Sequence, residues 1–119
     1  MKFSESLKKT LDFRNVYKNG TSRANRFLVL YIKENHTERN RLGISVSKKV
    51  GNSVVRHRLT RLIRESYRLH EEEFSKGLDI VVIARVNAKG ASYHNIEQAL
   101  LSLAESHAII DPVQEKELV

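Results

Sequence analysis

The distribution of apolar and polar residues along the chain predicts three β-strands. Residues 41–49 alternate, with branched apolar residues on one side and polar residues on the other, which is typical of a half-buried strand. Residues 27–33 and 79–84 are apolar at nearly every position, which favours strands covered on both faces. Together these segments predict a small sheet with one open, polar face.

Apolar residues spaced three and four apart predict helices between and after these strands. The first helix is expected over 10–20 and the second over 53–74, after helix caps in Gly51-Asn52-Ser53. The third is expected to begin at Ser92 or Asn95. The resulting order α-β-β-α-β-α predicts an α/β sandwich of the α+β class, in which helices pack on a small central sheet.

Length and composition indicate one domain over residues 1–119. A chain of 119 residues is short enough to have a single core. It contains no cysteine, which excludes disulfides, thiolate metal sites and cysteine nucleophiles. No apolar stretch suits a signal peptide or a membrane span, so we expect a cytoplasmic protein with no membrane partner. The residues from about 112 onward are expected to form a flexible tail.

Positive charge is concentrated in the middle of the chain. The 21 lysines and arginines outnumber the 14 acidic residues, and the formal net charge is +7. Residues 39–68 hold nine basic residues and one acidic residue, a net charge of +8, whereas residues 69–119 hold four basic and nine acidic residues, a net charge of −5. A local excess of this kind attracts polyanions, so nucleic acid is the leading class of partner.

The second predicted helix carries its basic residues opposite its apolar residues. At about 100° per residue, His57, Arg61, Arg64 and Arg68 lie roughly 140° to 200° away from Leu59, which marks the apolar side. The guanidinium group of arginine forms forked hydrogen bonds to phosphates and base edges, which lysine does not. This side of the helix is therefore a candidate surface for nucleic acid.

Two further observations favour nucleic-acid binding over an ordinary solvated face. Arg56 and Arg58 lie near the start of the helix, where free N–H groups and the helix dipole attract phosphate. On a solvated helix face, glutamates usually lie one turn away from the basic residues and form ion pairs with them. In this helix, Glu65 is the only glutamate before the acidic run at 71–73. A solvated basic face stays the alternative.

Residues 45–65, SVSKKVGNSVVRHRLTRLIRE, resemble the signature of the bacterial ribonuclease P protein subunit. That signature is S-x-K-[KR]-x-G-N-A-V-x-R-N-R-x-[KR]-R-x-x-R-E. Residues 12–20 and 26–31 also resemble the first helix and first strand of this family, so the likeness extends to about residue 107. The chain departs from the pattern at His57, where the family has asparagine, and at Thr60, where the family often has a basic residue.

This resemblance implies a fold like the second domain of ribosomal protein S5, with a left-handed βαβ crossover. It also implies a protein subunit of ribonuclease P, an endoribonuclease whose RNA subunit removes the 5′ leader of precursor tRNA with Mg²⁺. On this basis Mg²⁺ is bound by the RNA and the substrate, and the protein contributes neither a catalytic residue nor a metal site. The implied partners are the catalytic RNA and the leader, with no obligate protein partner.

The family pattern further implies two groups of binding residues. The group that lies against the catalytic RNA comprises Lys48, Lys49, Asn52, Arg56, His57, Arg58, Arg61, Arg64 and Arg68. The group that binds the single-stranded leader, by aromatic stacking beside cations, comprises Phe13, Tyr17, Tyr31, Ser45 and Lys49. On periodicity alone, Phe13 fits a position in the core equally well.

No self-contained active site is visible in the sequence. Phosphate-binding glycine loops, the nucleophile elbow and paired zinc-binding histidines are all missing. His57 and His70 could join the acidic run at 71–73 in a metal site, although a solvated helix end fits these residues better. Three hypotheses therefore remain: a ribozyme cofactor, which we favour, a non-catalytic RNA-binding module of the translation apparatus on an S5-like scaffold, and a protein-only metal-dependent nuclease.

Overall fold

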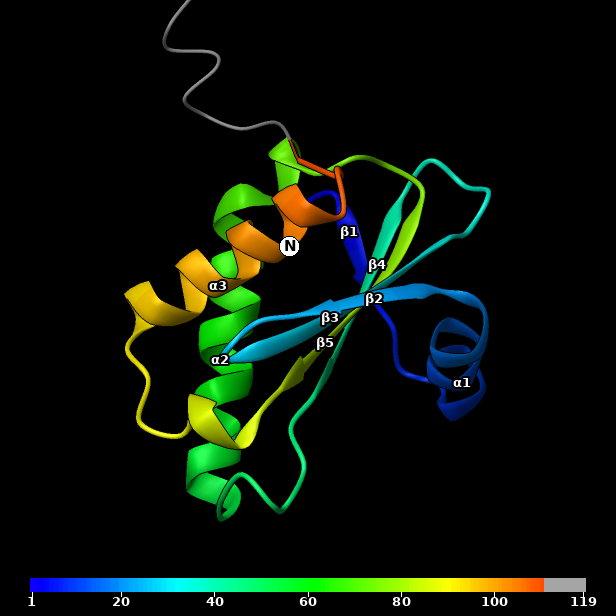
Figure 1. The fold of residues 1–119 in the computed structure, drawn as a ribbon. Coiled ribbons are helices and arrows are strands. Elements are labelled where there is room, and N and C mark those ends of the chain that lie inside the picture. The colour runs from blue at the N-terminus through cyan, green and yellow to red at the C-terminus, as the bar shows by residue number, and fades with distance from the viewer. Residues whose placement is uncertain (111–119) are drawn as a thin grey trace, which may run out of the picture.

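The computed structural model describes residues 1–110, which form a five-stranded sheet and three α-helices (Figure 1). The strands are β1 (Ser4–Ser6), β2 (Thr21–Ala24), β3 (Leu28–Glu34), β4 (Asn40–Ser45) and β5 (Leu78–Ala84). The helices are α1 (Thr10–Asn19), α2 (Ser53–His70) and α3 (Tyr93–Ser106), with short 3₁₀ turns η1 (Glu71–Glu73) and η2 (Val86–Ala88). The flexible tail expected from about residue 112 lies outside the described residues.

The strands form one mixed sheet in the order β1-β4-β5-β3-β2. Strand β4 pairs in parallel with β1 and β5, whereas β3 pairs antiparallel with β5 and β2. The central position of β5 explains why its sequence is apolar on both faces. Helix α2 and turn η1 form the crossover between the parallel strands β4 and β5, and the handedness of that crossover stays a prediction from the family resemblance.

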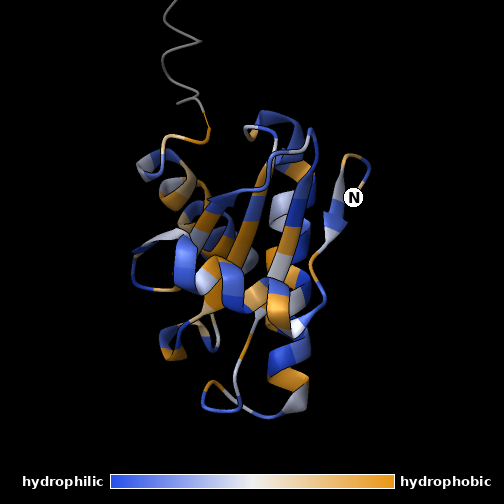
Figure 2. Ribbon diagram, turned by 90° about the vertical axis from the view of Figure 1, so that its right-hand side faces the viewer, coloured by the Kyte–Doolittle hydropathy of each residue, from blue (hydrophilic) through white to orange (hydrophobic). Residues whose placement is uncertain are grey.

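Helices cover both faces of the sheet, which confirms the predicted α+β class (Figure 1). On one face, α2 and α3 pack together over the main core, which includes Leu30 of β3 and Val82 of β5. On the other face, α1 buries Val16 against Val81 in a smaller cluster. Figure 2 looks onto this second face, where α1 crosses in front of strands with hydrophobic stretches. Because α1 covers only part of this face, Tyr31 of β3 is left half-buried.

The sequence analysis missed β1 and β2, so the observed order of α-helices and strands is β-α-β-β-β-α-β-α. Strand β1 consists of only three residues, SES, and β2 reads TSRA with all four residues exposed. Neither segment has the apolar alternation from which strands are recognised. Both lie at the edges of the sheet, where pairing with one neighbour holds them in place.

Two elements end earlier than the sequence predicts. Strand β4 stops at Ser45 rather than at residue 49, because its partner β5 also ends, at Ala84. Helix α2 stops at His70 rather than at Phe74, and η1 follows it. This tighter turn brings the Phe74 ring against that of the buried Tyr67, with ring centroids 5.0 Å apart.

The connection from α1 to β2 depends on Gly20, the residue at which the first helix was expected to stop. Its backbone is extended, with φ at −89°, so it does not act as a left-handed helix cap. A Cβ at this position would lie 2.5 Å from the carbonyl oxygen of Ile32 and 2.6 Å from that of Val16. Glycine is therefore required because the backbone passes so close to β3.

A buried carboxylate fastens the start of the chain to the end of α2. Glu71 is 4% exposed and accepts hydrogen bonds from the Lys2 N–H at 2.8 Å and the Ser4 hydroxyl at 2.9 Å. Burial alone would raise the pKa of Glu71, but these hydrogen bonds outweigh it and hold the pKa below its ordinary value. The short strand β1 is thus anchored by a charge as well as by its pairing with β4.

Candidate nucleic-acid interface

Helix α2 separates a buried apolar side from an exposed basic side, as its sequence predicts. The Asn52 side chain caps the helix by accepting a hydrogen bond from the Val55 N–H at 3.0 Å. Leu59 and Ile63 are fully buried in the main core. The opposite side is exposed, and we call it the arginine ridge: His57, Arg61, Arg64 and Arg68.

The charge of the arginine ridge is compensated at only one end. Among residues 1–110, Arg61 and Arg64 take part in no ion pair. Arg68 is paired with Glu65, whose carboxylate accepts a hydrogen bond from the Arg68 Nε at 3.0 Å. The ridge is therefore most strongly positive towards the N-terminal half of α2, where the helix dipole is also positive.

Arg56 and Arg58 lie beside the arginine ridge in different surroundings. The Nη2 of Arg58 donates a hydrogen bond to the carbonyl oxygen of Ala91 at 2.8 Å, so part of this side chain holds the segment that precedes α3. The Nε of Arg56 is buried and has no hydrogen-bond partner among the described residues. A buried donor without a partner is costly, so this nitrogen lowers the stability of the structure and presents no surface to a ligand.

Lys48 and Lys49 lie in the turn that connects β4 to α2. Both are exposed, and the turn is anchored by the buried Val50, whose N–H donates to the carbonyl oxygen of Ser47 at 3.1 Å. The alternation of residues 41–49 predicts a strand in which Lys49 lies on the same polar face as Ser45, and this prediction is wrong because β4 ends at Ser45. Lys49 instead adds its charge to the start of α2.

Three aromatic residues from α1 and β3 meet on the sheet face that carries α1. The rings of Tyr17 and Tyr31 are 5.0 Å apart in an edge-on arrangement, and those of Phe13 and Tyr17 are 6.3 Å apart. Tyr17 is 38% exposed, and burial raises its pKa above the ordinary value, although its interaction with the Ser45 side chain partly lowers it. We call Phe13, Tyr17, Tyr31 and Ser45 the aromatic face.

Phe13 also contributes to the core beneath α1. It is half-buried and packs against the small cluster that contains Val16 and Val81. Its ring lies directly over Gly43 of β4, where a Cβ would come within 2.6 Å of the Phe13 Cζ. The core position that periodicity allows for Phe13 is therefore confirmed, whereas its role in leader binding stays a prediction. Tyr17 is the most exposed ring of the three.

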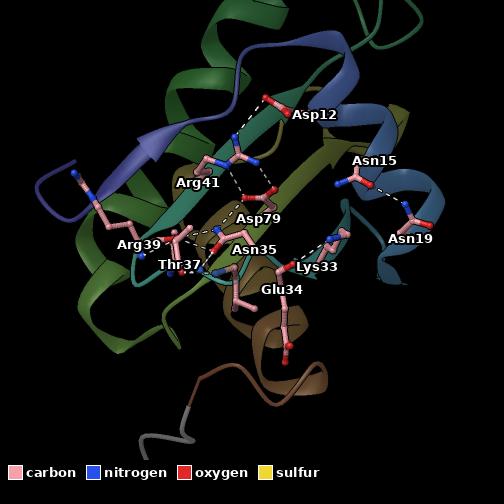
Figure 3. Close-up of polar contacts among 12 residues, drawn as sticks. Asp12, Asn15, Asn19, Lys33, Glu34, Asn35, Thr37, Arg39, Arg41 and Asp79 are labelled. Atoms are coloured by element: carbon pink, nitrogen blue, oxygen red, sulfur yellow. Dashed lines mark hydrogen bonds and ion pairs between the residues drawn. The ribbon is translucent and has the colours of Figure 1, made fainter.

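An ion pair holds α1 against the sheet on this same face (Figure 3). Arg41 of β4 donates two hydrogen bonds to Asp79 of β5, from Nε at 2.8 Å and from Nη2 at 2.6 Å. Its Nη1 reaches Asp12 of α1 at 3.4 Å. We call Asp12, Arg41 and Asp79 the α1 tether. Asn35 joins it by donating a hydrogen bond from Nδ2 to Asp79 at 3.0 Å.

The carboxylate of Asp79 is charged although it is only 2% exposed. Burial alone would raise its pKa, but the hydrogen bonds from Arg41 and Asn35 outweigh burial and lower it. The sequence analysis missed this site. The one signal in the sequence was that Asp79, a charged residue, begins an apolar strand. Its partner could not be predicted, because Arg41 lies opposite Asp79 only in the register of the folded sheet.

His70 lies at the other end of α2 and links it to η1 and α3. Its Nδ1 is 2.6 Å from a carboxylate oxygen of Glu73, and its Nε2 is 3.0 Å from one of Glu97. Within residues 1–110, no group of three or more histidines and carboxylates is arranged to hold a metal ion. In the same part of the chain, no helix is long and apolar enough to cross a membrane.

Comparisons with known proteins agree on one family. The Ribonuclease P family model matches residues 1–107. The ribonuclease P protein component of Lachnoclostridium phytofermentans is 61% identical over 107 residues, which cover 90% of this chain and 92% of that protein. The RNase P protein structure from Staphylococcus aureus has a TM-score of 0.84 at 38% identity, and the match covers 91% of this chain and 99% of that one. The RNase P protein from Thermotoga maritima has a TM-score of 0.79 at 32% identity, with 86% and 96% covered.

Fold and surface together define an α+β protein with a basic helix on one side of its sheet and an aromatic face on the other. The matches extend over most of this chain and over nearly the full length of its relatives. The chain therefore belongs to the family of ribonuclease P protein components.

Replacing Arg41 by Gln should leave the buried Asp79 carboxylate without its main partner. We expect the free energy of unfolding at pH 7 to fall by about 3 kcal/mol. This value is at the low end of the losses that follow the breaking of a buried ion pair, because Arg41 is partly exposed. In the native protein the pKa of Asp79 is lowered, so the stabilisation is lost as the pH falls. In the variant only the Asn35 hydrogen bond still opposes the effect of burial, so the pKa of Asp79 rises. Acidification should therefore narrow the difference in stability between the variant and the native protein.

Urea unfolding at a series of pH values measures both effects. The double variant Arg41→Gln/Asp79→Asn removes the orphaned charge and should be more stable than Arg41→Gln at pH 7. If the single and double variants unfold at the same urea concentration at pH 7, the α1 tether does not contribute as described.

Proposed function

We propose that this chain is the protein subunit of a ribonuclease P holoenzyme and binds both the catalytic RNA and the 5′ leader of precursor tRNA. The observation that carries the proposal is the arginine ridge, which is exposed along one side of α2 and in which Arg61 and Arg64 form no ion pair with any residue of 1–110. Membership of the ribonuclease P protein component family supports the role of a subunit.

The surface around α2 is the one we assign to the catalytic RNA. A folded RNA presents closely spaced phosphates, and arginine forks bind two oxygens of a phosphate at once. Lys48 and Lys49 extend the positive surface to the start of the helix, where the free N–H groups favour anions.

The aromatic face is the surface we assign to the leader. Unpaired nucleotides expose the faces of their bases, which stack on aromatic rings without regard to sequence. Tyr17 and Tyr31 present their rings beside each other on an incompletely covered part of the sheet, with Ser45 on the same face. A single strand fits this surface, whereas a duplex hides its base faces.

The hydrolytic step belongs to the RNA subunit in this proposal. Mg²⁺ held by the RNA and the substrate would activate the attacking water and stabilise the leaving oxygen. The residues of this chain would bind and orient: the arginine ridge would offset repulsion between phosphates of the two RNAs, and the aromatic face would fix the leader. Cleavage by the holoenzyme then yields the mature 5′ end of the tRNA.

Reconstitution tests the proposal directly. Precursor tRNA is incubated at low Mg²⁺ with the protein, with a catalytic ribonuclease P RNA, or with both. We expect efficient cleavage only with both, because the protein's cations replace part of the screening that Mg²⁺ otherwise supplies. Cleavage by the protein alone would indicate a protein-only nuclease, and RNA cleavage that the protein does not alter would indicate an RNA-binding module of another system.

Removing two ridge charges should weaken binding of the catalytic RNA in a salt-dependent way. For Arg61→Ala/Arg64→Ala, the slope of log affinity against log salt should become shallower by about 1.5, since each phosphate contact contributes roughly 0.7 to 0.9. Arg68→Ala is the matched control on the same helix, and it should change the slope less because Glu65 already compensates Arg68. An unchanged slope in the double variant would exclude this face.

The aromatic face should discriminate substrates by the presence of a leader. For Tyr17→Ala we expect the holoenzyme to bind precursor tRNA about 1 to 3 kcal/mol more weakly, the contribution of one stacked base, and to bind mature tRNA unchanged. Tyr17→Phe retains the ring and should retain most of the affinity. Equal losses for precursor and mature tRNA in a direct binding assay would contradict the assignment.

A further inference from the structure

A hollow of about 800 Å³ lies beyond the aromatic face, where the sheet ends. It is bounded by the end of β3, the loop at 36–37, the turn at 75–77 and residues 107–109 after α3. The connection from α1 to β2, at Gly20, forms its remaining side. None of the residues assigned above to the catalytic RNA or to the leader lines it.

Hydrogen bonds between its walls hold the hollow open. The Asn35 N–H donates to the carbonyl oxygen of Gly77 at 2.9 Å, and the Ser75 N–H donates to that of Ile109 at 2.8 Å. Gly77 has a φ of 79°, and a Cβ there would lie 2.5 Å from the carbonyl oxygen of Thr37. This approach is possible only for glycine, so the shape of the hollow is built into the fold.

The lining combines an apolar floor with a cationic rim. Ile32, Leu78 and Ile109 supply apolar surface, and Lys33 and Lys76 supply positive charge; the Lys76 Nζ lies 5.6 Å from the centre of the exposed Phe3 ring. His36 adds an imidazole, the His107 Nε2 is 2.8 Å from the carbonyl oxygen of Leu30, and within residues 1–110 Glu34 is the single carboxylate of the lining. A nucleotide has the matching chemistry, because its base is largely apolar on its faces and its phosphate is anionic.

The hollow continues the aromatic face along two elements. On β3, Lys33 follows Tyr31 by two residues and therefore points to the same face of the sheet, about 7 Å further along. On α1, Tyr17 is followed at the end of the helix by Asn19 and Gly20, which line the hollow. A strand that lies on the aromatic face therefore reaches the hollow without crossing another element.

We propose that this hollow is a second leader site, which binds nucleotides further from the cleavage site than those on the aromatic face. The inference rests on the proposed function, because it presupposes that the aromatic face binds the leader. Lys33 and Lys76 would contact the phosphates, and the apolar floor would take a base. The site extends the dependence of affinity on leader length beyond the nucleotides that the aromatic face can hold.

The test uses the reconstituted holoenzyme and precursor tRNAs whose leaders are lengthened one nucleotide at a time. For the native protein, affinity should rise with leader length in two stages, first as the aromatic face fills and then as the hollow fills. Lys33→Gln/Lys76→Gln should abolish the second stage only. The variant holoenzyme should therefore bind precursor tRNAs with long leaders several-fold more weakly, and those with the shortest leaders as tightly as the native holoenzyme. With long leaders, its salt slope should be shallower by about 1.4, for two contacts to a single strand.

Matched variants control for charge and for folding. Lys33→Arg/Lys76→Arg retains both charges and should retain the second stage. Lys89→Gln, which removes an exposed charge beyond the other end of β5, should not affect it. A loss that is equal for all leader lengths, or no loss at all, would overturn the second site while leaving the proposed function intact. If the native protein shows no dependence on the leader, the proposed function itself fails.

Crosslinking gives a readout that does not depend on variants. A photoreactive nucleotide is placed at successive leader positions in complexes with the native protein. Distal positions should crosslink to residues 33–37, 75–78 or 107–109, and proximal positions to residues 13–17 of α1 or 28–31 of β3. Distal crosslinks that fall only on α2 would overturn the proposal.

Discussion

The ion pair between Arg41 and the buried Asp79 is the interaction on which the leader-side architecture depends. It joins the neighbouring strands β4 and β5, reaches α1 through Asp12, and reaches the loop after β3 through Asn35. Because an unpaired buried carboxylate is costly, these partners stay together whenever the sheet is folded. The position of Tyr17 over the sheet depends on this network together with the burial of Val16 of α1 against Val81.

The crossover from β4 through α2 to β5 accounts for the placement of the two proposed RNA surfaces. Helix α2 packs on the face of the sheet opposite α1, so the arginine ridge and the aromatic face lie on different sides of the molecule. The exposed turn with Lys48 and Lys49 connects the two sides. A catalytic RNA and a leader can thus approach the same small protein without competing for the same atoms.

The spacing of apolar residues predicted the helices and strands that are buried on one side or on both sides. The basic side of α2 was predictable because Leu59 and Ile63 recur at helical spacing, and β5 because its interior is continuously apolar. Edge strands such as β2 carry no such signal, since main-chain pairing holds them. The partnership of Arg41 and Asp79 was also beyond reach, because it depends on strand register and joins residues far apart in the chain.

The charge of α2 differs between its two ends as well as between its two sides. Within residues 1–110, the arginines of its first half take part in no ion pair, whereas Arg68 is paired with Glu65 and the helix runs directly into the three glutamates of η1. The side chains of α2 and η1 are therefore positive towards the start of the helix and negative just after its end. A large anion diffusing towards it experiences a torque as well as an attraction, so encounters are biased towards one orientation before any contact forms, and added salt would erase that bias.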